Sequence, residues 1–156
     1  MQPETVAKLV THPRIIAIKE AFTGNSRMEK LLALRSEQFS VLSGDDETAC
    51  QAQLLGADGV ISVVSNLVPA TFRALCKLSR KGNKVEALAL DGELHPLYDI
   101  AGCEPNPIPA KAVLAAMSVC KETLRSPLTP LSSTHRPACQ AAAELAQLLE
   151  KRFLSA

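Results

Sequence analysis

The sequence predicts an α/β protein with about three parallel strands, joined by helices and followed by a region made only of helices. Three short runs, IIAI, FSVL and VISVV, are apolar at almost every position, which is typical of strands buried on both faces. Stretches of helical period separate these runs, and such strand–helix alternation favours a parallel sheet covered by helices. With 156 residues, the chain is long enough for one domain with a substantial core.

The first half of the chain contains all the predicted strands. In order, the expected elements are a helix at 3–10, a strand at 15–18, a helix at 26–35, a strand at 39–42, a helix at 48–55, a strand at 60–64 and a helix at 68–81. Pro3 suits the first turn of a helix, and His12-Pro13 should end that helix. Gly82 should stop the last one. Residues 1–82 are therefore expected to form three βα units.

The second half, residues 83–156, contains no convincing strand. Helices are predicted at 85–94, 110–124 and 139–154, and the prolines between residues 105 and 137 mark their connections. Three strands cannot close a barrel of eight, which typically needs about 250 residues. The chain is therefore either a small open sheet with a helical extension or the end of something larger.

Composition excludes several classes of function. The formal net charge is only +1, whereas proteins that bind nucleic acids collect a clear basic excess. No apolar run approaches the roughly 18 residues of a membrane span, and the start, MQPETVAKLV, lacks the pattern of a secretory leader. We therefore expect a cytoplasmic protein that binds neither nucleic acid nor membrane.

Neither the cysteines nor the histidines have metal-ligand spacing. The three histidines stand far apart, and the cysteines form no CxxC pair, so we expect reduced thiols packed as small apolar groups and no metal. The cysteines are Cys50, Cys76, Cys103, Cys120 and Cys139.

Lys19 is the first candidate for chemistry, because it ends the run IIAIK. In parallel α/β proteins the functional face lies at the carboxyl ends of the strands. A lysine partly desolvated there would have a lowered pKa and an amine free to attack a carbonyl. The alternative is a lysine that extends from the end of the sheet into water.

The neighbouring polar residues have two interpretations each. Gly44 either permits a tight turn or lets a small substrate approach the backbone beside Lys19. Asp45 and Asp46 either cap the following helix or form a pair of catalytic acids. Glu20 either orients the lysine or is a solvated strand end.

Six motifs occur together in a family-like order and spacing. They are PETVAKL, IIAIKEA, VLSGDDETA, GADGVISVVSN, EPNPIPAK and LRSPLTPLS. Together they resemble the C-terminal half of the dihydrodipicolinate synthase/N-acetylneuraminate lyase family, which consists of (β/α)₈ class I aldolases. The residues Glu20 and Ala21 after the lysine, together with EPNPIPAK and PLTPLS, resemble the synthase branch more than the lyase branch.

The resemblance implies an active site. Lys19 occupies the position of the lysine that forms an imine with pyruvate, at the end of the sixth barrel strand. Gly44 matches the glycine beside the bound pyruvate, and Ile61 matches a residue that contacts it. In the synthase branch the resulting enamine attacks aspartate semialdehyde, on the route to lysine and diaminopimelate. The protonated imine is itself the electron sink, so no cofactor or metal is implied.

The resemblance also implies what this chain lacks. Five of eight strands are absent, so the expected fold is an incomplete (β/α)₈ barrel with a C-terminal helical region. The family's proton-shuttling tyrosine is among the missing residues, and Tyr98 lies in the helical half and is not proposed as a substitute. Where the family continues with Thr-Gly after KEA, Phe22 precedes Thr23-Gly24 here, which alters the turn beside the lysine.

Two apolar strand edges would be left bare by the missing strands, which invites pairing with another chain. We therefore expect an isolated chain that is unstable or self-associates. Three alternatives stay open: an inactive remnant, a half-barrel completed by a separate N-terminal polypeptide, or another pyruvate-dependent aldolase of the family.

Overall fold

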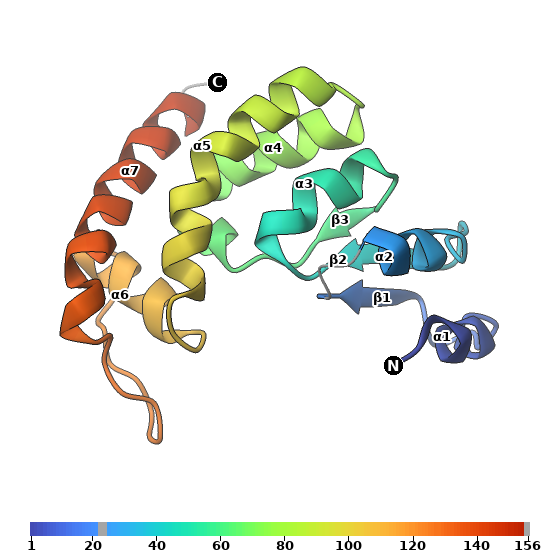
Figure 1. Cartoon of the computed structure of the whole chain (residues 1–156), viewed down its shortest axis with the longest axis horizontal. Helices are drawn as coiled ribbons and strands as arrows, with labels where there is room; N and C mark the ends of the chain where they lie inside the picture. The colour runs from blue at the N-terminus through green and yellow to red at the C-terminus, as the bar shows by residue number, and fades with distance from the viewer. Residues whose placement is uncertain (22–24, 155–156) are drawn as a thin grey trace. The chain divides into compact units, whose positions relative to one another are not determined.

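A computed structural model describes residues 1–21 and 25–154. It contains a sheet of three parallel strands in the order β1-β2-β3 (Figure 1). The strands are β1 (Ala17–Glu20), β2 (Ser40–Ser43) and β3 (Gly59–Val60). The predicted parallel sheet in the first half of the chain is therefore confirmed. The altered turn at Phe22 and Thr23-Gly24 lies outside the described residues.

The register of the strands aligns their carboxyl ends. Lys19 pairs with Leu42 and Glu20 with Ser43 between β1 and β2. Ser43 in turn pairs with Val60 of β3. Because all three strands run in one direction and end at the same level, the residues that follow them lie along one edge of the sheet.

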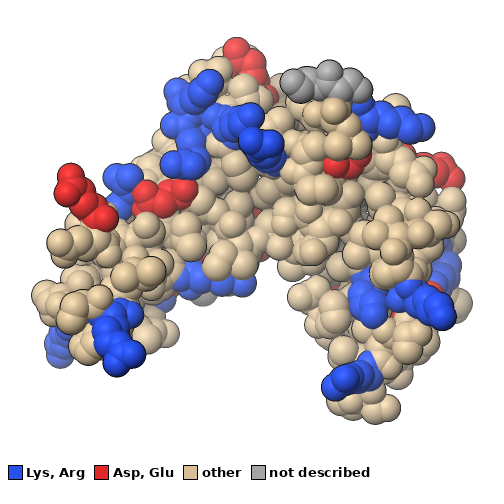
Figure 2. Space-filling model, turned by 180° about the vertical axis from the view of Figure 1, so that it is seen from behind, with Lys and Arg blue, Asp and Glu red and all other residues tan. Residues whose placement is uncertain are grey.

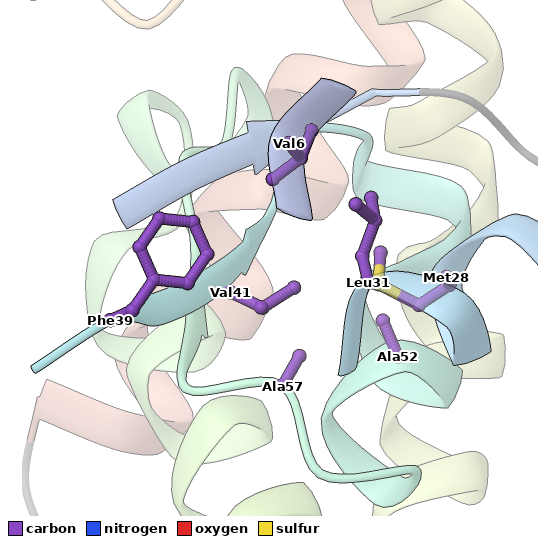
Figure 3. Packing of buried hydrophobic residues seen from close by; sticks show 7 residues of the cluster. All are labelled: Val6, Met28, Leu31, Phe39, Val41, Ala52 and Ala57. Atoms are coloured by element: carbon purple, nitrogen blue, oxygen red, sulfur yellow. The ribbon is translucent and has the colours of Figure 1, made fainter. Parts of the chain in front are cut away.

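Helices of the first half pack on one face of this sheet. Three of them, α1 (Pro3–Leu9), α2 (Asn25–Leu32) and α3 (Asp46–Leu54), supply buried side chains to a common core. The members of that core, labelled in Figure 3, are Val6, Met28, Leu31, Phe39, Val41, Ala52 and Ala57. By the alternation of side chains along a strand, Val41 faces this core and Leu42 faces the other side.

All three strands differ from their predicted bounds, β2 by a shift of one residue and the other two by more. The strand predicted at 15–18 lies at Ala17–Glu20, because these are the residues that pair in register with Ser40–Ser43 of β2. The strand predicted at 60–64 covers only Gly59–Val60. There the chain turns, since the backbone N–H and the side-chain amide of Asn66 both donate to the Val63 carbonyl, at 3.0 and 2.9 Å.

The remaining helices are α4 (Pro69–Arg80), α5 (Lys84–Gly102), α6 (Ile108–Ala116) and α7 (Arg136–Leu154), with short 3₁₀ turns η1 (Val64–Asn66) and η2 (Ser133–His135). The carboxylate of Glu150 accepts the N–H groups of Ala70 and Thr71 at 3.1 and 2.8 Å, so α7 caps the start of α4.

Two of these helices have unexpected lengths. Helix α5 continues through Pro96, beyond the predicted end at residue 94, and its buried Leu97 and Ile100 show that packing outweighs the lost hydrogen bond. Helix α6 ends at Ala116 instead of residue 124. Ser118 there has a left-handed φ of 61°, and the Val119 N–H donates back to the Leu114 carbonyl at 2.9 Å, which is a Schellman-type stop.

The chain divides into two compact units. The first comprises Met1–Ser62 and Cys76–Leu88, and the second comprises Val63–Leu75 and Ala89–Ala156. The sheet and the three candidate site residues Lys19, Gly44 and Ile61 all belong to the first unit.

The surface carries both signs of charge. Figure 2 shows basic and acidic side chains dispersed over one face, with broad areas of neither kind between them. Among the residues that the structure describes, no helix is long and apolar enough to cross a membrane.

Asp58 links the amino ends of β2 and β3 by hydrogen bonds. Its carboxylate accepts the Val41 N–H at 2.9 Å and the Arg35 Nε at 2.7 Å. Partial burial tends to raise the pKa of Asp58, but the Val41 hydrogen bond and the Arg35 charge outweigh it and leave that pKa below its usual value.

We therefore expect Asp58 to make stability depend on pH in acid. A depressed carboxyl pKa contributes stability that is complete above the unfolded-state value and is lost as the pH falls through the folded-state value. Urea unfolding of Asp58→Asn between pH 7 and pH 3 should show a flatter acid profile than the wild type. The exposed Glu37→Gln serves as the matched control, and equally steep profiles for Asp58→Asn and wild type would contradict this role.

Candidate active site

Lys19 lies at the carboxyl edge of the sheet, on the face opposite the core. Its neighbour Ile18 packs against the core, whereas Ala17 and Lys19 are exposed. The expectation that this strand is buried on both faces, with a desolvated lysine, is therefore wrong for this chain. The reason is that β1 is an edge strand, with β2 as its one hydrogen-bonded neighbour among the described residues.

Gly44 lies directly against the Lys19 side chain. A Cβ atom built on Gly44 would be 2.7 Å from Lys19 Cγ and would also overlap Cε. The Gly44 N–H donates to the Glu20 carbonyl at 2.7 Å, which continues the β1–β2 ladder by one bond. The close approach that requires a glycine here is therefore made by the lysine itself.

Ile61 completes the edge on the far side of β2. Its N–H donates to the Ser43 carbonyl at 2.9 Å, just as Gly44 bonds to Glu20 on the near side. Its side chain is 49% exposed. The three predicted site residues, Lys19, Gly44 and Ile61, thus follow one another across a single sheet edge.

Asp45 has a structural role. Its carboxylate accepts the Thr48 backbone N–H at 3.0 Å and the Thr48 hydroxyl at 2.7 Å, which makes it the N-cap of α3. Asp46 is the first residue of that helix. Of the two interpretations of this pair, helix capping is thus confirmed for Asp45.

Glu20 is not a solvated strand end. Its side chain is 9% exposed, and its Oε2 atom accepts the Arg27 Nε at 2.7 Å. Arg27 also donates to the Met1 carbonyl. Sequence reasoning did not find this pair, because two residues seven positions apart across a strand–helix turn follow no spacing rule.

Tyr98 belongs to the second unit, and the five cysteines are divided between the two units. The Tyr98 hydroxyl donates to Asp91 at 2.9 Å within α5, which accounts for it structurally. Burial raises the pKa of the Cys76, Cys103 and Cys139 thiols above their usual value, so these groups are poor nucleophiles. All five cysteines are free thiols, as expected.

Comparison with known proteins places this edge in context. The model of the dihydrodipicolinate synthetase family matches residues 1–146. The chain belongs to this family. A 4-hydroxy-tetrahydrodipicolinate synthase from Stenotrophomonas maltophilia is 49% identical over 138 residues, which are 88% of this chain and 46% of that protein. One from Xanthomonas campestris is 48% identical over 148 residues, which are 95% of this chain and 49% of that protein.

Solved structures of dihydrodipicolinate synthases agree with this assignment. The enzyme from Acinetobacter baumannii, complexed with pyruvate, has a TM-score of 0.89 at 35% identity and covers 94% of this chain and 50% of its own. The enzyme from Aquifex aeolicus has a TM-score of 0.82 at 32% identity, covering 97% of this chain and 50% of its own.

The chain thus spans about half the length of the dihydrodipicolinate synthases it matches. The expected fold class, an incomplete (β/α)₈ barrel with a C-terminal helical region, is confirmed by this likeness and by the three parallel strands. A sheet from half of a barrel leaves its inward face without the strands that would enclose it, which explains why Lys19 and Ile61 are exposed.

Proposed function

We propose that Lys19 forms an imine with pyruvate, and that this chain carries the nucleophilic half of a 4-hydroxy-tetrahydrodipicolinate synthase. The observation that supports this most directly is the fit of the Lys19 side chain over the bare backbone of Gly44. The sheet edge at which these residues meet is the usual place for chemistry in parallel α/β proteins. Membership of the synthetase family, and the likeness to a synthase complexed with pyruvate, favour the same substrate.

The chemistry follows from an amine and a keto acid. The unprotonated Lys19 nitrogen adds to C2 of pyruvate, and loss of water gives a protonated imine. This cation accepts the electron pair left when a methyl proton departs, which gives an enamine. The enamine carbon attacks the aldehyde of aspartate semialdehyde, and hydrolysis of the imine returns the free lysine. The sequence of steps is redox-neutral, since the water lost in forming the imine is regained in its hydrolysis, so no electron-carrying cofactor is needed.

An exposed lysine is poorly prepared for the first of these steps. Only the neutral amine attacks, and exclusion of water favours the neutral form. Within its unit, the sheet face that carries Lys19 also carries the half-buried Leu42 and the exposed Ile61. We therefore propose that a second polypeptide covers this face and supplies the proton-transfer groups that are expected from the other half of a synthase.

The free edge of β1 offers that polypeptide a place to bind. The carbonyls of Ile16 and Glu20 accept hydrogen bonds from β2 through the N–H groups of Ser40 and Gly44, at 2.9 and 2.7 Å. In a parallel ladder the intervening residues direct their N–H and C=O groups to the opposite side. The backbone groups of Lys19 are therefore available to a strand from a partner.

Borohydride trapping tests the proposal. The chain is incubated with pyruvate and borohydride, with and without the amino-terminal half of the Stenotrophomonas maltophilia relative, and the adduct is located by peptide mass spectrometry. We expect a reduced pyruvate adduct on Lys19, formed faster when the added half is present. The Lys19→Met variant should give none.

The same experiment decides against the alternatives. An adduct on another lysine would contradict the assignment of Lys19. If both halves are folded and still no adduct forms when the added half is present, the result would support an inactive remnant instead.

A further inference from the structure

The Glu20–Arg27 ion pair lies directly behind the proposed nucleophile. Glu20 follows Lys19 in β1, and its carboxylate lies on the core side of the sheet while Lys19 lies on the other. The side chains of Glu20 and Arg27 are only 9% and 19% exposed, so both charges are largely withdrawn from water. Such a pair is expensive to bury, and it adds less to stability than its short distance suggests.

Arg27 connects two other segments of the chain to the end of β1. Arg27 belongs to α2, which is anchored in the core by Met28 and Leu31. Its guanidinium donates to Glu20 through Nε and to the Met1 carbonyl, ahead of α1, through Nη2. The planar fork of an arginine fixes direction as well as distance, which an ammonium group would not.

The backbone of Glu20 connects the ion pair to the site. Its carbonyl accepts the Gly44 N–H at 2.7 Å, and Gly44 is the residue over which the Lys19 side chain lies. A rotation of the peptide at Glu20 would therefore move the lysine and its glycine support relative to each other.

We infer that Arg27, acting through Glu20, is a positioning residue that fixes the end of β1 so that the Lys19 amine stays over Gly44. The inference deepens the proposed function, on which its kinetic readout rests. Its physical basis is that a largely buried guanidinium, bound through Nε to Glu20 and through Nη2 to the Met1 carbonyl, restricts geometry, even where hydrophobic residues of similar size would give equal stability.

The decisive variant replaces both partners, Glu20→Met with Arg27→Met. Each single replacement strands a buried charge and should lower the melting temperature, whereas the double variant removes both charges and should melt close to the wild type. If the pair positions Lys19, the double variant should still trap pyruvate about 10-fold to 100-fold more slowly, as expected for a displacement of about 1 Å.

A second readout is independent of pyruvate. The chain has seven glycines, so selective ¹⁵N-glycine labelling gives a sparse spectrum in which the exchange of the Gly44 N–H can be followed. We expect exchange at Gly44 to accelerate about tenfold in the double variant, because the Glu20 carbonyl is held less firmly. This measurement tests the inference even if the wild type forms no adduct. The lack of an adduct in the wild type would count only against the proposed function.

Two further variants complete the test. Arg27→Lys keeps the charge without the fork, and it should fold and show an intermediate trapping rate and Gly44 exchange. Arg35→Met with Asp58→Asn removes a second ion pair of the described residues, at the amino ends of the strands, and should change neither the trapping rate nor the Gly44 exchange. A double variant at Glu20 and Arg27 that folds and shows wild-type trapping and wild-type Gly44 exchange would overturn the inference. If the double variant does not fold, wild-type values for both readouts in a folded Arg27→Lys would overturn it instead.

Discussion

Replacement of Gly44 by alanine should abolish most imine formation and leave folding almost unchanged. The added methyl group would occupy space that Lys19 Cγ and Cε now fill. Misplacement of a reacting group by about 1 Å can cost about 100-fold in rate, so we expect a loss of at least that order in the trapping assay.

Two features of the site should allow this change to affect imine formation without affecting stability. The φ angle of Gly44 does not lie in the left-handed region, so alanine fits the backbone without strain. Lys19 is exposed and can swing into water, so the free energy of unfolding should change by less than about 0.5 kcal/mol. The trapping rate and urea unfolding are to be measured on the same protein.

A neighbouring glycine provides the control. A Cβ at Gly59 would be 3.4 Å from Leu42 Cδ2, a contact that small shifts can relieve, so Gly59→Ala should retain most of the trapping rate. In a Lys19→Ala background, Gly44→Ala should be neutral or slightly stabilising, because alanine restricts the unfolded chain. A trapping rate in Gly44→Ala equal to that of the wild type would mean that the lysine does not react from its observed position.

The second large effect is expected from Leu31→Ala, a change in the core. Leu31 is a fully buried residue of α2 and a member of the core cluster that includes Val6 of α1 and Val41 of β2. Leucine-to-alanine changes in cores cost about 2–5 kcal/mol, and whole domains are stable by only about 5–15 kcal/mol. We expect the urea midpoint to fall sharply, and the trapping rate to fall with it as α2 loosens.

Leu88→Ala is the matched control for this core change. Leu88 lies on α5 in the same unit and is 42% exposed, so truncation leaves no enclosed cavity, and alanine favours the helix. Its urea midpoint should stay close to that of the wild type. Equal destabilisation by the two substitutions would show that the cluster around Leu31 is not the core of this unit.

Hydrophobic pattern was enough to predict the parallel sheet, but not where its strands begin and end. The run IIAI predicts a strand at residues 15–18, yet pairing with β2 decides the bounds, and this shifts β1 to Ala17–Glu20. In the same way, apolar residues after Val60 suggest a longer strand, while the bonds from Asn66 to Val63 turn the chain. The composition of a short segment does not show which residues will form these hydrogen bonds.

The candidate site was predictable in part. The motif order pointed to Lys19, Gly44 and Ile61, and the register brings all three to one edge. The packing of the Lys19 side chain against Gly44 could not be predicted, because it depends on the path of a side chain. The Glu20–Arg27 pair was missed for a related reason, since it arises only when α2 packs back onto β1.

The direction of β1 restricts which assemblies can be productive. A strand that joins its free edge continues the carboxyl edge of the sheet only if it runs parallel to β1. Two copies of the chain that pair antiparallel along this edge would form hydrogen bonds with the same backbone groups, but they would enclose no reaction chamber. Such pairs would be unproductive, so a second copy of the chain would compete with a productive partner for this edge.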